Sequence, residues 1–458
     1  MEYKRKNIWL NINEDQKQEL FNISDDYINF LDTARTERLA VKEIIKRAEA
    51  AGYVELDENA SSLNPGDKVY AVNKNKGVVM FHIGDEDITN GMNIVGAHLD
   101  SPRLDLKPVP VSEDSNLAYL KTHYYGGVKK YQWTTIPLAL HGVIYTKDGE
   151  LVEISIGDKD DEPVFTISEL LIHLSRKLMD KSAREVIEGE QLKILVGSIP
   201  LNDEDDNPVK KNILKILNEK YGIIEEDFIT AEFEAVPAIK TRHAGLDNSM
   251  ILGHGHDDRV CAYGALNAIL DIENPTRTAV GLFVDKEEIG SYGATGMSSQ
   301  FFENTLLEIL NLVGKADLIS FKRALKNSKV LSADVTLAED PNFKGVTELD
   351  NTAQLGCGVA LTKYTGSGGK GGSNDANAEY LQEVRAAFDK SDVIYQTGEL
   401  GAVDAGGGGT IAFILAEYAM DVVDCGTPVV SMHAPTELIS KADLYSTCKA
   451  YKAFYENI

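Results

Sequence analysis

The chain opens on an apolar pattern that predicts helix and then strands. Between residues 14 and 51, apolar side chains such as Leu20, Phe21, Ile44 and Ile45 recur at roughly helical spacing, which predicts a helical entry segment. Apolar runs with the length and composition of strands come next, at residues 68–72, 77–83 and 93–100. This order, helix before strands, is typical of a domain that mixes both kinds of element.

The pattern changes between about residues 109 and 245. Short stretches of alternating apolar and polar residues, such as 142–146 and 151–156, are separated by acidic turns such as 157–162. Alternation of this kind is typical of half-buried strands. We therefore predict a smaller β-rich domain inserted into a larger one, with boundaries at 1–108, 109–245 and 246–458.

After about residue 246 the α/β pattern returns. An amphipathic helix is predicted over 258–272, and further elements are predicted from apolar runs and helical spacing: strands at 278–284, 329–335 and 428–432, and helices near 304–313 and 375–389. Alternating strands and helices predict an α/β fold with a mixed central sheet that helices cover on both faces.

Composition narrows the classes of partner. Among 458 residues, 72 are acidic and 46 basic, giving a formal net charge of -26, which argues against nucleic acid or an anionic membrane as the main partner. The four cysteines are single and widely spaced, so neither a disulfide framework nor a thiolate zinc site is indicated. No signal peptide and no apolar run of about 18 residues is present, and we expect a cytoplasmic protein.

Two adjacent glutamates follow a predicted buried strand. Glu287 and Glu288 come directly after the apolar run 279–284 and are followed by Gly290. In an α/β sheet the carboxyl end of a strand is where side chains meet a ligand. Neighbouring carboxylates there suggest that one binds a metal and the other moves a proton. The alternative is an ordinary solvated acidic turn, which is the commoner fate of a Glu pair taken alone.

Other strand ends carry similar side chains. They provide imidazole or carboxylate groups at His98, Asp100, Asp334 and His433, and the stretch 254–259, just before a helix, adds two histidines and two aspartates including Asp257. Each could be a structural histidine or a helix cap. Together they predict a metal site at the carboxyl edge of the sheet, and nitrogen and oxygen donors suit zinc, cobalt or manganese.

Glycine is concentrated in two runs, at 366–372 and at 406–409. Neither matches the phosphate-binding pattern Gly-x-x-x-x-Gly-Lys-Ser/Thr. A backbone without side chains can approach a ligand or another chain closely, so these runs are either walls of an active site or flexible connectors.

Five motifs, taken together and in this order, are highly specific. They lie at residues 96–108, 285–291, 332–334, 403–412 and 431–433. On these motifs, over nearly the whole chain, the sequence resembles the aspartyl aminopeptidase and aminopeptidase I family of dinuclear metallopeptidases. The resemblance implies the zinc-peptidase fold and two divalent metal ions per subunit, with zinc as the leading candidate and cobalt or manganese as alternatives.

The resemblance also implies a role for each site residue. His98 and Asp334 would be the terminal ligands of one metal ion, and Glu288 and His433 those of the other. Asp257 would bridge the two ions, although its neighbour Asp258 is a second candidate for this position. Glu287 would be the general base, and Asp100 would steer the imidazole of His98.

The family resemblance further implies an inserted dimerisation domain. A histidine of that domain, matched here by His173, would reach the active site of a neighbouring subunit, and dimers would assemble into a tetrahedral dodecamer. The other reading of His173 is a residue on an amphipathic helix. Residues 335–342 and the segment after 125–127 differ from typical members, which leaves the preferred N-terminal residue of the substrate open.

The sequence therefore predicts an aminopeptidase that removes N-terminal residues from peptides. The alternatives are a related dinuclear deacylase or carboxypeptidase, which substrates with blocked or free N-termini would distinguish, and a catalytically silent assembly protein. The intact set of donors and Glu287 argue against the silent protein. A nucleotide-binding module is disfavoured because no phosphate motif is present.

Overall fold

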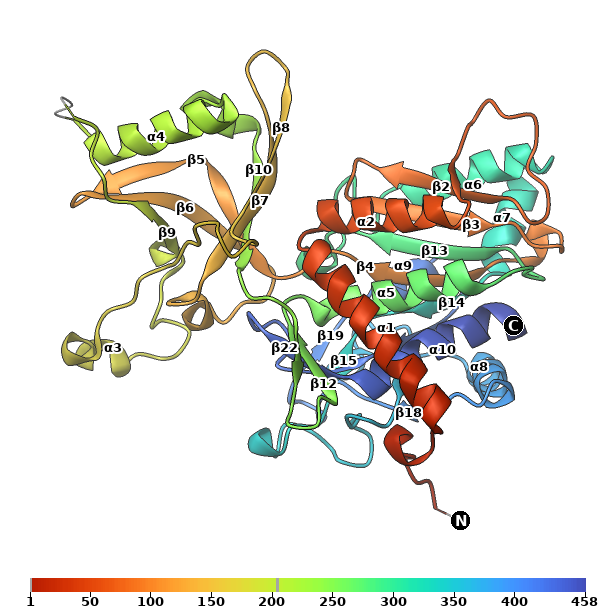
Figure 1. The fold of residues 1–458 in the computed structure, drawn as a ribbon. Helices are drawn as coiled ribbons and strands as arrows, with labels where there is room; N and C mark the ends of the chain where they lie inside the picture. The colour runs from red at the N-terminus through yellow and green to blue at the C-terminus, as the bar shows by residue number, and fades with distance from the viewer. Residues whose placement is uncertain (1, 203–205) are drawn as a thin grey trace. The chain divides into compact units, whose positions relative to one another are not determined.

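The computed structural model describes residues 2–202 and 206–458, and the chain forms two compact units (Figure 1). The first unit contains the chain up to Ser101 together with Thr241–Met432 and Glu437–Ile458, and the second contains Pro102–Lys240 and His433–Thr436. The domain boundaries predicted from the sequence, at 108/109 and 245/246, stay predictions.

A nine-stranded mixed sheet forms the centre of the first unit. Its strands, in spatial order, are β1 (Val54–Glu55), β2 (Lys68–Asn73), β3 (Gly77–His82), β13 (Ala279–Val284), β4 (Asn93–His98), β14 (Lys329–Ser332), β20 (Asp421–Gly426), β16 (Val359–Thr362) and β18 (Tyr395–Thr397). Strands β13, β4, β14 and β20 are parallel to one another, whereas β3 and β16 run antiparallel to their neighbours β13 and β20. The predicted α/β fold with a mixed sheet is confirmed.

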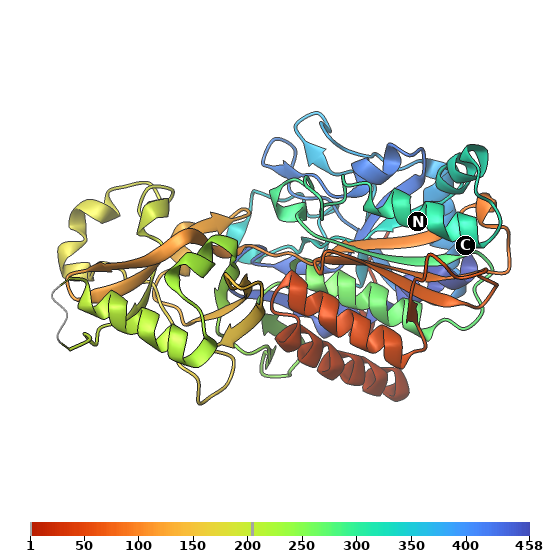
Figure 2. The ribbon, with the colours of Figure 1, turned by 90° about the horizontal axis from the view of Figure 1, so that it is seen from above.

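Helices cover both faces of this sheet because its strands are apolar on both. In β13, Val280, Leu282 and Val284 pack into one core, and Ala279 and Phe283 pack into the other. The helices on the Phe283 side are α1 (Glu14–Thr33), α2 (Glu37–Ala50), α5 (His256–Asp271), α8 (Ala378–Lys390) and α10 (Lys441–Asn457). Those on the other side are α6 (Phe301–Leu312), α7 (Leu318–Lys326) and α9 (Ala412–Ala416), and Figure 2 shows α1 and α2 on the face opposite α6. A sheet buried on both faces reads as continuous apolar runs, as 279–284 does.

The predicted helical segment 14–51 is two helices. Asn13 caps α1 through a capping box with Gln16, and Thr36 starts α2 by accepting a hydrogen bond from the backbone N–H of Leu39. Ala34 has non-helical backbone angles. Because Ser and Thr side chains satisfy the free N–H groups of a first turn, Thr36 supplies the signal for a new helix that apolar spacing alone does not contain.

A five-stranded sheet also belongs to the first unit. Its strands are β11 (Arg242–Ala244), β12 (Met250–Gly253), β22 (Glu437–Ser440), β21 (Pro428–Val430) and β15 (Thr336–Leu337). Strand β12 pairs with β22 so that Gly253 lies opposite Glu437. This pairing brings Glu437 next to the start of α5.

The second unit is built on a six-stranded antiparallel sheet. Its order is β8 (Leu151–Ile156), β7 (Leu138–Tyr145), β10 (Glu232–Pro237), β5 (Arg103–Asp114), β6 (Leu117–Tyr125) and β9 (Lys193–Gly197). Alternate residues such as Leu140, Ile154 and Phe233 enter its core, with α4 (Pro208–Tyr221) packed against them. The alternating pattern noted in this stretch is thus that of a sheet with one buried face.

The two glycine runs pair with each other. Strand β17 (Gly366–Ser367) is antiparallel to β19 (Gly407–Gly408). A Cβ atom on Gly407, whose φ is 153°, would lie 2.0 Å from the carbonyl oxygen of Gly366. Glycine is therefore required at position 407 for the backbones to come this close.

Within the ranges 2–202 and 206–458, no helix is long and apolar enough to cross a membrane.

His82, at the end of β3, is a buried titratable group in this sheet. Its ring lies edge-on to Tyr53, and it faces Lys68 and Ala279 on the neighbouring strands. Burial, and then the charge of Lys68, lower the pKa of His82 to about 4. Below pH 6.5 the unfolded chain binds a proton at this position that the folded chain does not, so stability falls as the pH decreases from 6.5 towards 4.

We therefore predict a pH-dependent difference between the protein and His82→Gln. The variant loses packing at pH 7.5, and its disadvantage shrinks by roughly 1–2 kcal/mol at pH 5, because it has no histidine to protonate at this position. Urea unfolding at a series of pH values measures the gap. Gln382→Ala, at an exposed amide that does not titrate, provides the control, since its gap to the unchanged protein should stay constant with pH. A His82→Gln gap that does not change with pH would contradict the expected proton uptake.

Candidate metal centre

Three parallel strands deliver donor groups to one edge of the central sheet. In the register of β13, β4 and β14, Val284 lies opposite His98, and Gly96 lies opposite Ser332. His98 ends β4, Asp334 comes two residues after β14, and the 3-10 turn η7 (Glu287–Ile289) follows β13. Because these strands point the same way, their carboxyl ends bring the imidazole and the carboxylates together.

The first group of donors contains His98, Asp257 and Asp334. One ligand atom from each lies within 4.8 Å of the others. Nε2 of His98 is 3.3 Å from Oδ1 of Asp257 and 3.8 Å from Oδ1 of Asp334. One imidazole and two carboxylates at this spacing form a donor set that suits a divalent transition metal ion.

The ring of His98 is held by its other nitrogen. Nδ1 lies 2.9 Å from the carbonyl oxygen of Asp100 and 3.3 Å from its Oδ1. With Nδ1 as the donor to this carbonyl, the lone pair of Nε2 faces the carboxylates. Nε2 is buried and makes no hydrogen bond to any residue that the structure describes. A buried nitrogen in this condition fits a metal ligand, because a bound ion would occupy its lone pair.

Asp100 also fixes the two glutamates. Its Oδ1 accepts a hydrogen bond from the backbone N–H of Glu287 at 3.1 Å, and its Oδ2 accepts one from that of Glu288 at 3.2 Å. The side chain of Asp100 is fully buried. One carboxylate therefore orients the imidazole of His98 and the turn that carries both glutamates.

The second group of donors contains Asp257, Glu288 and His433. His433 follows Met432 directly and has a φ of 65°. Its Nδ1 lies 3.1 Å from the carbonyl oxygen of Gly127, an arrangement that leaves Nε2 as the ligand atom. Asp257 is common to both groups, as a bridging carboxylate would be.

Asp257 and Asp258 have different surroundings. Asp257 lies at the start of α5 and donates its backbone N–H to Oε2 of Glu437 at 3.1 Å. Asp258 belongs to neither donor group. Its Oδ2 accepts from the backbone N–H of His98 at 3.4 Å, and burial raises its pKa well above the usual value. Asp258 is thus a buried support for the strand end.

The negative charges of the first donor group favour the binding of a cation. Burial, and then the nearby Glu287 carboxylate, raise the pKa of Asp334 well above its usual value. Burial lowers the pKa of His98, but the nearby negative charges of Asp100, Asp257 and Asp334 outweigh it and raise that pKa well above normal. Carboxylates crowded in a buried place repel one another, and a divalent cation removes this repulsion.

Sequence reasoning missed the residues that support Asp257. Ser101 donates its hydroxyl to the carbonyl oxygen of Asp257 at 2.6 Å, and Nη2 of Arg259 donates to Ser101 at 2.7 Å. Arg259 is buried, and its Nη1 also donates to the carbonyl oxygen of Ala34. The sequence gives one indirect signal for the support of Asp257. Glu437, which accepts the backbone N–H of Asp257, is the one acidic residue between 425 and 440, a stretch that is otherwise apolar or neutral.

Two other histidines, His256 and His173, lie outside the two donor groups. His256 is buried, with Nδ1 2.7 Å from the hydroxyl of Tyr27, and belongs to neither donor group. His173 is exposed on the short turn η4 (Ile172–Leu174) of the second unit, not on an amphipathic helix. Exposed apolar side chains flank it: Leu170, Leu171, Ile172 and Leu174.

Comparison with known proteins gives the same picture over the whole chain. A family model described as aminopeptidase I zinc metalloprotease (M18) matches residues 30–455. A protein of Clostridium acetobutylicum named probable M18 family aminopeptidase 1 is 53% identical over 456 residues, covering 99% of this chain and 98% of that protein.

Solved structures agree. The crystal structure of an M18 family aminopeptidase from Thermotoga maritima superposes with a TM-score of 0.96 at 46% identity, covering 100% of both chains. At 20% identity, a structure titled as the mApe1 dodecamer of S. cerevisiae shares the fold with a TM-score of 0.77, covering 94% of this chain and 96% of that one. The predicted resemblance is confirmed: the chain belongs to the aminopeptidase I zinc metalloprotease family (M18), whose members are hydrolases acting on peptide bonds.

Proposed function

We propose that the protein removes N-terminal residues from peptides with two divalent metal ions per subunit. The observation that carries the proposal is the pair of donor groups that share Asp257. The first ion would be held by His98, Asp257 and Asp334, and the second by Asp257, Glu288 and His433. When bound, such ions supply Lewis-acid activation of a water molecule and of the scissile carbonyl group.

Glu287 is our candidate for the general base. It belongs to neither donor group, and its Oε2 lies 3.9 Å from Nε2 of His98. Its carboxylate is therefore close to the proposed ligands without being one of them. In this role Glu287 takes a proton from the attacking water and delivers it to the leaving amine. Asp100, through its bonds to the backbone of residues 287 and 288, sets the position of this carboxylate.

Free N-terminal peptides are the proposed substrates. A free α-amine is attracted to the carboxylates at this edge of the sheet, and such an interaction restricts cleavage to the first residue. Zinc is the proposed native metal because the matching family model is described as a zinc metalloprotease. Cobalt and manganese suit the same mixture of nitrogen and oxygen donors.

We also propose that the second unit mediates self-assembly. The exposed apolar side chains around His173 have the character of a contact surface. A dimer formed through this surface would carry His173 to the active site of a second copy, and dimers would build a dodecamer like the one named for the S. cerevisiae relative. The four cysteines are buried and unpaired, which supports a reducing compartment, and we propose the cytoplasm.

Replacing the base tests the division of roles between the two glutamates. Glu287→Gln should keep about two metal ions per subunit and lose activity by a factor of about 10² to 10⁴, because the amide cannot accept the proton. Elemental analysis and hydrolysis of free aminoacyl substrates measure the two quantities. Glu417→Gln, at an exposed glutamate, is the matched control and should behave like the unchanged protein. Full activity in Glu287→Gln would discard the assignment.

Replacing Asp100 tests the support for the ligands. In Asp100→Asn, an amide NH₂ group replaces one of the two oxygens that accept backbone N–H groups, so the ligands lose their fixed orientation. We expect metal affinity to fall about 10- to 100-fold, measured by competition with a chromogenic chelator. Asp87→Asn removes an exposed carboxylate paired with Lys315 and should leave the affinity unchanged. Equal affinities in the two variants would exclude this role for Asp100.

A further inference from the structure

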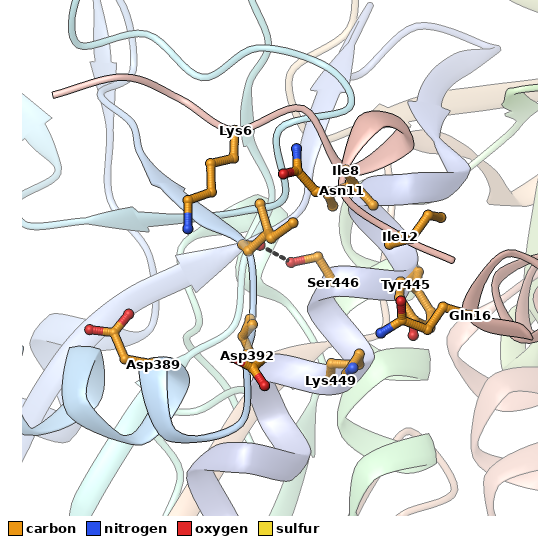
Figure 3. A pocket seen from close by; sticks show the side chains of 12 residues that line it. Lys6, Ile8, Asn11, Ile12, Gln16, Asp389, Asp392, Tyr445, Ser446 and Lys449 are labelled. Atoms are coloured by element: carbon orange, nitrogen blue, oxygen red, sulfur yellow. Dashed lines mark hydrogen bonds between the residues drawn. The ribbon is translucent and has the colours of Figure 1, made fainter. Parts of the chain in front are cut away.

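A polar cavity lies in the first unit, and none of the donor residues lines it. Its volume is about 400 Å³, within the range of about 300–1,000 Å³ typical of small-molecule sites. Three parts of the chain form it: the N-terminal segment with the start of α1, the end of α8 with the loop that follows, and α10 (Figure 3). The cavity is therefore assembled by tertiary folding and is not a gap within one loop.

Charges of both signs surround this cavity. Two cations, Lys6 and Lys449, and two anions, Asp389 and Asp392, line it. Figure 3 shows Lys6 and Asp389 on one side and Lys449 on the other, with Asp392 between them. Within residues 2–202 and 206–458, neither Lys6 nor Asp392 has an ion-pair or hydrogen-bond partner for its side chain. Opposite charges that line one hollow, two of them without a partner, suit a ligand that carries both signs.

Part of the remaining cavity lining is apolar and well fixed. Ile8 and Ile12 line it, and both pack in a small core with Leu20 and Tyr445. The backbone N–H of Ile8 donates to the carbonyl oxygen of Gly356 at 2.8 Å. These contacts hold the N-terminal segment in place, so a ligand would not have to order it.

The loop side is fixed in the same way. Ser446 donates its hydroxyl to the carbonyl oxygen of Ile394 at 2.5 Å, the bond drawn in Figure 3, and accepts from the backbone N–H of Val359 at 3.1 Å. Asp392 has a φ of 52° in the tight turn after α8.

We propose that this cavity binds a free α-amino acid with an apolar side chain. The ammonium group would face Asp389 and Asp392, the carboxylate would face Lys449, and the side chain would lie against Ile12. The ligand class follows from the charges and the apolar wall. The biological role of this binding rests on the proposed function. An aminopeptidase releases free amino acids, so the cavity would sense the product of the reaction.

Calorimetric titration of the metal-loaded protein with L-leucine tests the proposal. We expect a dissociation constant on the order of 1 mM, since the charged groups are exposed to water and such pairs are individually weak. A product can also occupy the catalytic site, so two molecules per subunit are expected. Asp392→Asn should reduce this number to one, and asparagine tolerates the left-handed backbone at this position. Lys449→Gln should have the same effect.

Matched variants and ligand analogues separate binding in the cavity from binding at the catalytic site. Lys390→Gln, on the same helix end as Asp389 but outside the cavity, should still bind two molecules. N-acetyl-leucine and leucinamide, which each lack one charge, should bind the cavity at least tenfold more weakly. Binding that Asp392→Asn and Lys449→Gln leave unchanged, or equal binding of N-acetyl-leucine, would overturn the proposal. If the protein had no peptidase activity, the single cavity site would still be lost in Asp392→Asn, so the two proposals can fail separately.

Discussion

The structure depends on holding several negative charges together at one buried edge of a sheet. A ligand atom of Asp257 lies within 4.8 Å of those of His98 and Asp334 in one group and of those of Glu288 and His433 in the other. Charges in such a place are costly unless paired, and the imidazole of His98 lies beside the carboxylates of Asp257 and Asp334. Divalent cations are the natural counter-charge. The parallel strands and the bonds of Asp100 fix the donors before any ion binds, so the ion does not have to order them.

Much of this edge could be predicted from the sequence because its signals are local. His98, Glu288 and Asp334 each stand at the end of an apolar run, and a strand that is buried on both faces leaves only its end for a polar side chain. Asp257 could be located because two histidines and two aspartates precede a helix. The choice between Asp257 and Asp258 could not be made locally, since it depends on which carboxylate faces His98 and which is buried behind it.

Contacts between distant parts of the chain account for what the sequence did not reveal. Asp100 accepts hydrogen bonds from residues 287 and 288, far along the chain, and no periodicity encodes such a pairing. Strand β20 escaped prediction because Asp421 and Asp424 interrupt its apolar pattern, although Asp424 is buried and bonded to Thr410. The sequence alone did not decide whether the glycine runs are walls of an active site or flexible connectors. Their close approach is to each other, which only the pairing of β17 with β19 reveals.

Buried carboxyl groups in this protein are accommodated in two different ways. Asp443, in α10, accepts hydrogen bonds from the backbone N–H groups of Gly356 and Gly358, yet burial raises its pKa to about 8. A single buried carboxyl can thus take up a proton and remain neutral near pH 7. The carboxyl groups around Asp257 differ because several of them lie close together beside a histidine. If each were protonated, none would be the deprotonated ligand that a metal ion requires. Burial alone therefore does not identify a site; convergence of several donors on one point does.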